Sequence, residues 1–461
     1  MTASRDAAVT AAESWAAGGA FEAALHALVA LPSESQVPGN HAALERVLRE
    51  GAVPLLEDLG FAWEIMPNPD PAHGPFLLAE RLEDGGPTVL CYGHGDTVHG
   101  QAGAWSDGMD PFAVTRVGDR LYGRGTADNK GQLLINLGAL KAVLAARGRL
   151  GFSLKLVIET GEEAGSPGLG ALFEAHRDRL SADVLIASDG PRLQPDRPTL
   201  FMGSRGAVNF DLEVDLRDGA HHSGNWGGLL RDPAQVLAHA IASIATPDGA
   251  LKIPEWRPTS LTDDIRAALA GLPIEEASGP AIDPSWGEPG LSPAERAYGW
   301  NSFAVLAMSS GRPEAPVNAI SPSARATCQL RFVVGTDADD ILPALRRHLD
   351  REGFGAVRLV PGDVAFKATR LSPDHPWVRF VAGSLERTAG AAPHILPNLA
   401  GSLPNDLFQD ILGLPTVWVP HSYRACSQHA PDEHMLLSGA VDAARCMAGL
   451  WWDLGEGETP A

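Results

Sequence analysis

The sequence predicts an α/β fold in which a mostly parallel sheet carries helices on both faces, with a smaller α+β domain inserted into it. Two observations support this class. Short apolar runs alternate with helical patterns through about the first 200 residues, which is typical of a parallel sheet buried on both faces. After residue 204 the strands instead alternate apolar and polar residues, which is typical of a sheet with one face in water.

Three strands and one long helix are predicted in the first part of the chain. The strands cover residues 88–92, 154–158 and 184–187. Residues 130–147 predict a helix, because leucines recur on one helical face. These leucines are Leu133, Leu134, Leu137, Leu140 and Leu144. In parallel sheets ligands collect beyond the carboxyl ends of the strands, so the residues that follow each strand are the first candidates for a site.

The second part of the chain predicts four strands and two helices. Residues 209–217 alternate strictly, and the next helix begins with Asp232 as N-cap and Pro233 in its first turn. The remaining elements, in chain order, are strands at 302–308 and 324–334, a helix at 337–351 and a strand at 357–360. The order β-α-β-β-α-β is that of the ferredoxin-like unit.

Three domain segments follow from this change of pattern. The first part of the large domain covers residues 1–203, the inserted domain covers 204–368, and the second part of the large domain covers 369–461, with a strand at 416–419. The segment from about 250 to 300 is rich in proline, glycine, tryptophan and acidic residues. We interpret it as a long loop, which is usually either functional or mobile. Its Trp256, Trp286 and Trp300 either cover a site or pack on the inserted domain.

Composition excludes several classes of protein. The 461 residues carry 36 lysines and arginines against 57 acidic residues, a net charge of −21, so no basic surface for nucleic acid is expected. The N-terminal region lacks the pattern of a secretory signal, and no stretch approaches the roughly 18 apolar residues of a membrane span. The four cysteines are far apart and form no CxxC pair. Free thiols and a cytoplasmic location are therefore expected.

Potential metal ligands follow the predicted strands. The first strand leads to His94 and Asp96, the second to Glu162 and Glu163, and the third to Asp189. Asp128 precedes the predicted helix, and His429 follows the strand at 416–419. Singly, each has an ordinary explanation as a cap, a turn residue or a solvated helix start. Together they would meet at one edge of one sheet.

Imidazole and carboxylate ligands favour zinc, cobalt or manganese over a structural thiolate site. One carboxylate can bridge two such ions, and a hydrolytic site also needs a carboxylate that is free to accept a proton from water. The adjacent Glu162 and Glu163 could divide these tasks. Asp96, two residues from His94, could fix the orientation of its imidazole.

Four segments resemble the signatures of a known enzyme family. The segments GHGDTV, LYGRGTADNKG, ETGEEAGSPG and SQHAPDEH are similar to those of the dinuclear metallopeptidases that include carboxypeptidase G, aminoacylase, carnosinase and related dipeptidases. The resemblance covers nearly the whole chain. It implies that His94 and Asp189 hold one metal ion, that Glu163 and His429 hold the other, and that Asp128 bridges both. It also implies that Glu162 is the general base, that Asp96 orients His94 and that the peptide bond after Asp128 is cis.

The resemblance assigns further residues to the substrate. In the family the inserted domain mediates dimerisation, and the histidine of an HSG motif, here His222, stabilises the oxyanion in the partner subunit's site. Arg331 matches an arginine that binds the substrate carboxylate, and Asn318 is expected in the same pocket. Gly401 and Ser402 resemble a Gly-Gly-Ser loop that binds the substrate backbone. Ala400 replaces the first glycine of that loop, which puts dipeptide specificity in question.

The expected function is hydrolysis of an amide bond in a small carboxylate-bearing substrate such as a dipeptide, by a homodimer with two divalent ions, zinc being the family default. Alternatives are an N-acyl or N-carbamoyl amino acid amidohydrolase and a non-catalytic, metal-dependent, peptide-binding dimer. The carboxylate of Glu162 argues against the last, because a pure binder needs no base.

Overall fold

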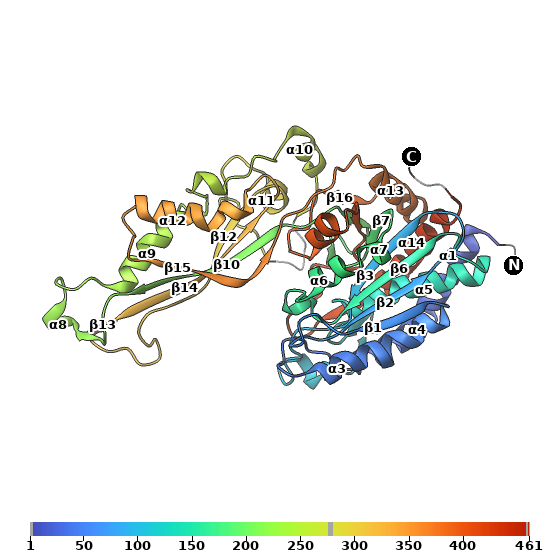
Figure 1. Ribbon diagram of the computed structural model, residues 1–461, viewed down its shortest axis with the longest axis horizontal. Helices are drawn as coiled ribbons and strands as arrows, with labels where there is room; N and C mark the ends of the chain where they lie inside the picture. Colours follow the sequence, from blue (N-terminus) through green and yellow to red (C-terminus); the bar gives the residue numbers. More distant parts are fainter. Residues whose placement is uncertain (1–2, 275–279, 458–459, 461) are drawn as a thin grey trace.

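The computed structural model describes residues 3–274, 280–457 and 460. The chain forms two lobes, and both termini lie on the lobe that contains the larger sheet (Figure 1). That sheet has eight strands, and most of its neighbouring pairs are parallel. In spatial order they are β1 (Ala62–Met66), β2 (Phe76–Arg81), β6 (Ser153–Glu159), β3 (Thr88–His94), β7 (Val184–Ala187), β17 (Thr416–Trp418), β9 (Thr199–Phe201) and β16 (His394–Leu396).

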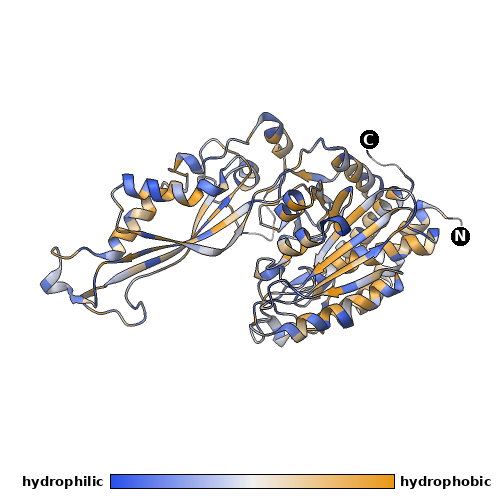
Figure 2. Cartoon of the chain, in the orientation of Figure 1, coloured by the Kyte–Doolittle hydropathy of each residue, from blue (hydrophilic) through white to orange (hydrophobic). Residues whose placement is uncertain are grey.

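Helices cover both faces of this sheet, which confirms the predicted fold class. One face packs against α1 (Arg5–Ala17), α2 (Ala20–Val29), α5 (Lys130–Arg147), α13 (Pro376–Ala389) and α14 (Leu437–Leu454). The other face packs against α6 (Leu169–Ala175) and α7 (Arg177–Leu180). In Figure 2 the strands of the large sheet are mostly orange, the colour of hydrophobic residues, and the helices around them carry both orange and blue segments. The buried apolar area on both faces is the main stabilising contribution to such a lobe.

Shorter elements complete the large lobe. Near the N-terminus these are α3 (His41–Arg46), a π-helical stretch (Val47–Ala52) and α4 (Val53–Asp58). A three-stranded sheet contains β4 (Thr115–Val117), β5 (Arg120–Tyr122) and β19 (His434–Leu436), and a two-stranded sheet pairs β8 (Pro191–Arg192) with β18 (Ser422–Tyr423). These small sheets tie the C-terminal loops to the loops that follow the large sheet.

The second lobe is a four-stranded antiparallel sheet with two helices on one face. Its spatial order is β12 (Ser302–Ser309), β14 (Ser323–Phe332), β10 (Gly206–Asp215) and β15 (Arg358–Phe366), and the helices are α9 (Pro233–Ile244) and α12 (Ile341–Arg351). This is the connectivity predicted for a ferredoxin-like unit. Asp232 caps α9 as predicted, since its side chain accepts the backbone N–H of Ala234 at 2.9 Å.

The far tip of this lobe carries a two-stranded antiparallel sheet and one short helix. The strands are β11 (His221–His222) and β13 (Ala319–Ile320), and the helix is α8 (Ser223–Trp226). In Figure 1 this tip lies at the end of the molecule opposite to the two termini.

The segment from 250 to 300 is more ordered than the expected loop. It contains α10 (Asp263–Leu269) and α11 (Pro293–Tyr298), and both pack into the core of the large lobe. Trp256 instead fills the core of the four-stranded lobe, where it contacts Phe210 and Phe303. The interpretation as a long loop is therefore wrong in part, because two short helices bridge the lobes; residues 275–279 of the segment lie outside the described residues.

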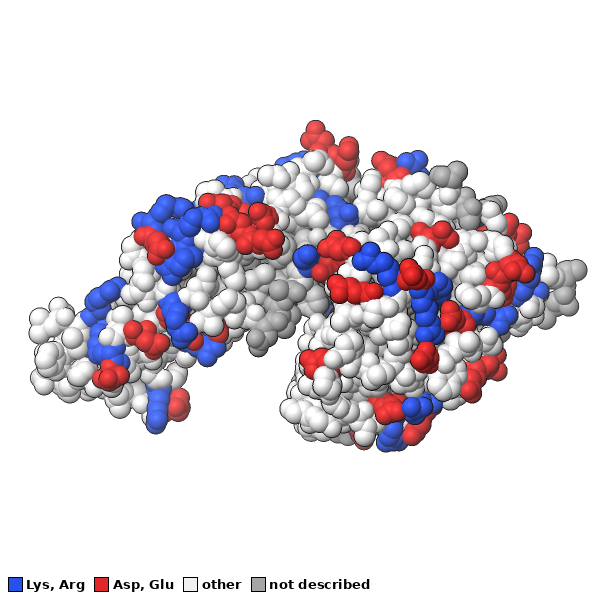
Figure 3. Space-filling view, viewed as in Figure 1, with Lys and Arg blue, Asp and Glu red and all other residues white. Residues whose placement is uncertain are grey.

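The distribution of surface charge and the state of the cysteines agree with what the composition predicts. On the face seen in Figure 3, acidic and basic side chains are interspersed over both lobes. The four cysteines are free and buried. Among the described residues, the helices are all too short or too polar to cross a bilayer.

Candidate metal centre and substrate cleft

Neighbouring parallel strands bring the first site residues together. Strands β6, β3 and β7 lie side by side and run parallel, with His94 paired to Glu159 at their ends. His94 is the last residue of β3, and Asp189 follows β7 by two residues. Beyond β6, Glu162 and Glu163 begin a short 3₁₀ turn (Glu162–Ala164). The carboxyl edge of the sheet therefore collects these four side chains, as expected from the sequence.

Asp128 and His429 reach the same edge from loops. Asp128 lies directly before Asn129, the N-cap of α5, and the peptide bond between them is cis, as expected from the family resemblance. His429 lies between β18 and β19 with a left-handed backbone, φ 61°. A non-glycine residue with this conformation is uncommon in proteins and points to a constrained loop.

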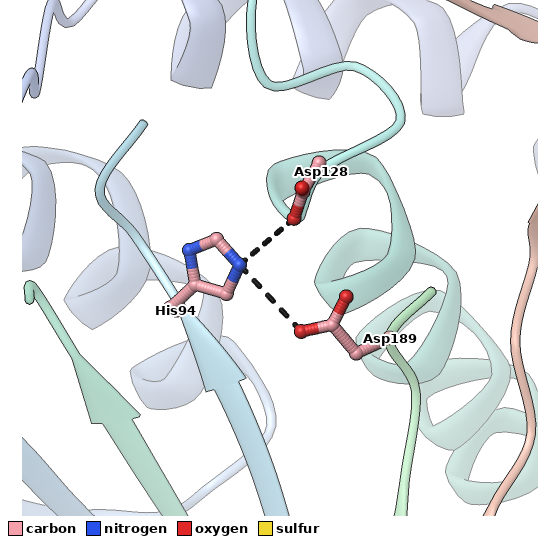
Figure 4. A group of neighbouring side chains, drawn as sticks. All are labelled: His94, Asp128 and Asp189. Carbon is pink, nitrogen blue, oxygen red and sulfur yellow. Dashed lines mark hydrogen bonds and ion pairs between the residues drawn. The ribbon is translucent and has the colours of Figure 1, made fainter. Parts of the chain in front are cut away.

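His94, Asp128 and Asp189 form the first donor group (Figure 4). The Nε2 atom of His94 lies 3.0 Å from Oδ1 of Asp128 and 3.6 Å from Oδ2 of Asp189. All three side chains are buried. Oδ2 of Asp189 is buried without a hydrogen-bond donor among the described residues. A buried carboxylate oxygen without a donor is costly in a folded protein, so this atom fits a metal ligand.

Asp128, Glu163 and His429 form the second donor group. The Nε2 atom of His429 lies 3.0 Å from Oδ2 of Asp128 and 3.1 Å from Oε2 of Glu163. Asp128 thus directs one oxygen into each group. This arrangement suits a carboxylate that bridges two cations.

The electrostatics of the two groups favour cation binding. Burial, and then the charge of Asp128, raise the pKa of Asp189 and the pKa of Glu163 to about 7. Hydrogen bonds to Asp128 and Glu163 raise the pKa of His429 to about 11. Burial alone would lower the pKa of His94, but hydrogen bonds to Asp128 and Asp96 raise it well above its usual value. Several carboxyl groups thus share a small volume, where divalent cations would replace the protons.

Glu162 belongs to neither donor group, although it lines the same cleft. Burial raises the pKa of its carboxyl group well above the usual value. Its backbone N–H and that of Glu163 both donate to the Asp96 carboxylate, at 3.3 and 3.1 Å. Asp96 therefore positions the two glutamates relative to one another.

Asp96 also contacts His94, in a way that the sequence did not indicate. The nearest acceptor to Nδ1 of His94 is the main-chain carbonyl of Asp96, at 3.1 Å, whereas the carboxylate oxygen lies at 3.4 Å. The segment around Asp96 thus fixes the imidazole mainly through the backbone.

Glu433 is a supporting residue that the sequence analysis did not assign. Its Oε1 accepts the backbone N–H groups of Gly125, Ala127 and Asp128 at 3.0, 3.0 and 3.1 Å. Its Oε2 pairs with Arg124. Its position shortly after His429 was the one feature of the sequence that could have pointed to a role near the site. That it holds the loop that carries Asp128 is seen only in the fold.

A cleft of about 330 Å³ opens over the two donor groups. Arg331, Gly401 and Ser402 line it, and the Arg331 guanidinium donates to Oγ of Ser402 at 3.0 Å. Its Nε also donates to Gln329 at 3.0 Å, and no carboxylate of the described residues pairs with it. An arginine of this kind fits an incoming carboxylate. Gln428, which donates to Asp128, is a further lining residue that the sequence analysis missed.

His222 and Asn318 do not lie in this cleft. Both are exposed at the far tip of the second lobe, where the carbonyl of Asn318 accepts the N–H of Ser223 at 2.9 Å. The expectation that Asn318 shares the pocket of Arg331 does not hold within one chain. The tip pairs β11 with β13 and so keeps both residues away from the site of their own chain.

The chain belongs to peptidase family M20/M25/M40, whose model matches residues 90–453. The predicted family and the predicted hydrolase class are thereby confirmed. The match includes all the donor residues of both groups.

Individual relatives and a solved structure agree with this membership. The chain is 28% identical over 404 residues to the cysteinylglycine-S-conjugate dipeptidase of Corynebacterium striatum, covering 86% of this chain and 83% of the relative. It is 38% identical over 185 residues to the Beta-Ala-His dipeptidase of Mus musculus, but this match spans only 39% of this chain and 37% of the relative. Human carnosine dipeptidase 1 has the same fold, with a TM-score of 0.80 at 22% identity, covering 97% of this chain and 99% of that one.

Proposed function

We propose that this protein is a dinuclear metallodipeptidase that hydrolyses the peptide bond of small substrates with a free carboxylate. The observation that carries the proposal is the pair of donor groups that share Asp128 beneath a cleft containing Arg331. The names of the two relatives, both dipeptidases, support the substrate class.

His94 and Asp189 would hold one ion, Glu163 and His429 the other, and Asp128 would contact both. Zinc is the ion we propose; the same nitrogen and oxygen donors also suit cobalt and manganese. When bound, such ions polarise a carbonyl and lower the pKa of water. Glu162, outside both groups, would accept the proton from that water and deliver it to the leaving amine.

Arg331 would bind the substrate carboxylate, and the backbone at Gly401 and Ser402 would align the substrate beside it. Support comes from the hydrogen bond between Arg331 and Ser402 and from the lack of a carboxylate partner for Arg331 among the described residues. A guanidinium that is already oriented loses little freedom on binding.

A homodimer would complete the site. Strand β12 is an edge of the four-stranded sheet, and its Val305, Leu306 and Met308 are 41%, 54% and 48% exposed. An unpaired apolar edge strand is a surface on which a second copy can add. In that dimer His222 of one subunit would stabilise the oxyanion in the other, and Asn318 would accompany it.

The domain segments 1–203, 204–368 and 369–461 and a cytoplasmic location are part of the same proposal. The free, buried cysteines support a reducing compartment. The change from the eight-stranded to the four-stranded sheet near residue 204 supports the first boundary.

The test is an assay of the protein after chelation and after return of zinc, cobalt or manganese. The panel contains dipeptides together with N-acetyl, N-succinyl and N-carbamoyl amino acids. Metal-dependent cleavage of dipeptides is expected. Cleavage of the N-acyl or N-carbamoyl compounds alone would replace the proposed substrate class, and metal binding without any hydrolysis would indicate a peptide-binding protein.

A further inference from the structure

Part of the cleft lining is apolar, whereas Arg192 and Arg424 lie elsewhere in the lining, and this apolar wall lies beside the residues that would hold the substrate carboxylate. We infer that the wall selects substrates whose carboxylate-bearing residue has an apolar side chain, such as leucine or phenylalanine. The inference rests on the proposed function, because it names the substrate class of the same site.

The wall consists of buried side chains from three separate segments. They are Leu193, Tyr298, Leu396, Leu399 and Leu403, and none is more than 8% exposed. All five belong to the core that covers one face of the large sheet. Because they are packed against that core, they form a preformed surface and need no rearrangement to meet a ligand.

Leu399 connects the wall to both the metal centre and the carboxylate site. A methyl group on Gly190, the residue after Asp189, would lie 3.3 Å from its Cδ2 atom, and a methyl group on Gly401 would lie 3.4 Å from the same atom. Its side chain therefore lies between the turn at Asp189 and the loop that precedes Ser402. A carboxylate held by Arg331 and Ser402 brings its own side chain next to this leucine.

A second cavity that Arg331 also lines is more polar. This cavity of about 320 Å³ shares Glu162, Arg331 and Ser402 with the cleft, but Gln36, Asn209 and Gln329 contribute to its lining. A polar side chain would lose less hydration free energy by entering that cavity than by packing against the leucine wall. An apolar side chain instead gains free energy against the leucine wall, in proportion to the area that it buries.

The segment that bridges the lobes supplies part of the wall. Tyr298 is the last residue of α11, and α11 and α10 bury Ala294 and Leu269 in the same core. The segment that bridges the lobes thus contributes to the lining of the cleft through Tyr298. The volume of about 330 Å³ is at the lower end for small-molecule sites, which favours one side chain of leucine size over a longer peptide.

The experiment compares kcat/KM for a Gly-Xaa series in which only the carboxylate-bearing residue changes. The series is Gly-Gly, Gly-Ala, Gly-Leu, Gly-Phe, Gly-Asp and Gly-Gln, measured on the metal-loaded, full-length protein. Gly-Leu is expected to exceed Gly-Gly and Gly-Asp by at least about 10-fold. Equal values across the series, or a preference for Gly-Gln or Gly-Asp, would overturn the inference while leaving the proposed function intact. If the protein cleaved neither the dipeptides of this series nor N-acetyl amino acids, the proposed function itself would be rejected.

A pair of variants locates the effect. Leu193→Ala removes a wall residue, and Leu180→Ala removes a leucine that is equally buried, at 2% exposure, in the same core but outside the cleft lining. The ratio of kcat/KM for Gly-Leu to that for Gly-Gly should fall about 10-fold in Leu193→Ala and stay unchanged in Leu180→Ala. This ratio does not depend on the fraction of active protein. An unchanged ratio in both variants would contradict the inference, and if Leu193→Ala does not fold, the substrate series on the unmodified protein decides.

Discussion

The carboxylate of Glu433 lies 2.6 Å from the guanidinium of Arg124, and both side chains are only 1% exposed. The residues are 309 positions apart in the chain. The other oxygen of Glu433 accepts three backbone N–H groups of the loop that ends at Asp128. One buried ion pair thus joins the C-terminal loop that carries His429 to the loop that carries the shared carboxylate.

Glu433→Gln should destabilise the protein by about 3–5 kcal/mol, because it leaves the Arg124 charge buried without its partner. Metal affinity should fall as well, since the Asp128 loop loses its anchor. Denaturant unfolding and zinc titration measure the two effects. The matched control is Glu50→Gln, which breaks an ion pair of Arg46 and Glu50 in which both side chains are more than half exposed and should change neither quantity. If the two variants had the same stability and the same zinc affinity, Glu433 would have no positioning role.

Glu162→Gln should lower kcat by at least about 100-fold and leave the metal content unchanged, because the carboxylate would act as the base and belongs to neither donor group. Dipeptide turnover and elemental analysis of the dialysed protein are the measurements. Glu174→Gln, at an exposed position on α6, is the control. Activity near that of the unmodified protein would reject the role of Glu162.

Asp128→Asn should release both metal ions, whereas Glu163→Gln should release only one, because Asp128 alone belongs to both donor groups. The unmodified protein should hold about two ions per chain. Elemental analysis after dialysis against metal-free buffer gives the stoichiometry. Retention of both ions by Asp128→Asn would show that this residue is not shared.

The chelated protein should become less stable between pH 6 and pH 8. The pKa values of Asp189 and Glu163, about 7, and of His429, about 11, all lie above their ordinary values of 3.8, 4.5 and 6.5. At these three groups the folded state therefore binds more protons than the unfolded state, so their contribution to the free energy of unfolding decreases as pH rises. Zinc competes with these protons, and its affinity should rise over the same interval. Denaturant unfolding and calorimetry at both pH values test the two signs, and a chelated protein that gains stability toward pH 8 would contradict them.

Mixing two inactive variants should restore activity if subunits share sites. Glu162→Gln lacks the base, and His222→Ala lacks the group proposed to act in the other subunit. In a mixed dimer one of the two sites has both residues, so about one quarter of the unmodified activity is expected after random exchange. Light scattering establishes the oligomeric state in the same samples. A fully active monomer, or an active His222→Ala variant, would refute the shared site.

Much of the metal centre could be predicted because it follows from strand order. His94, Glu163 and Asp189 each follow a buried apolar strand, and parallel neighbours place their carboxyl ends at one edge. Asp128 and His429 come from loops; their positions before a predicted helix and after a predicted strand placed them at the same edge, and the family resemblance gave them their separate roles. The pairing of Glu433 with Arg124 carries no local signal, because it depends on how two distant loops fold together.

Of the two helices in the bridging segment, α11 could have been found from its cap. Ser292 and Glu295 form a capping box at the start of α11, with the Ser292 side chain accepting the N–H of Glu295 at 3.2 Å, and Pro293 occupies the first helical turn. The six residues of this helix are too few to show an apolar period, so a search for periodicity misses it. Their packing against the large lobe, and not the inserted one, depends on tertiary contacts that no local pattern records.

Helices α10 and α11 lie in sequence between strands of the four-stranded sheet, yet they bury Ile265, Leu269 and Ala294 against the large lobe. The inserted region therefore cannot be deleted without disturbing the core of the large lobe. A shortened chain that joins residue 203 directly to residue 369 would remove α10 from its contact with β16 and expose apolar residues of the large lobe's core, which favours aggregation. Shortened versions of this protein would have to keep α10 and α11, even if the four-stranded sheet were replaced.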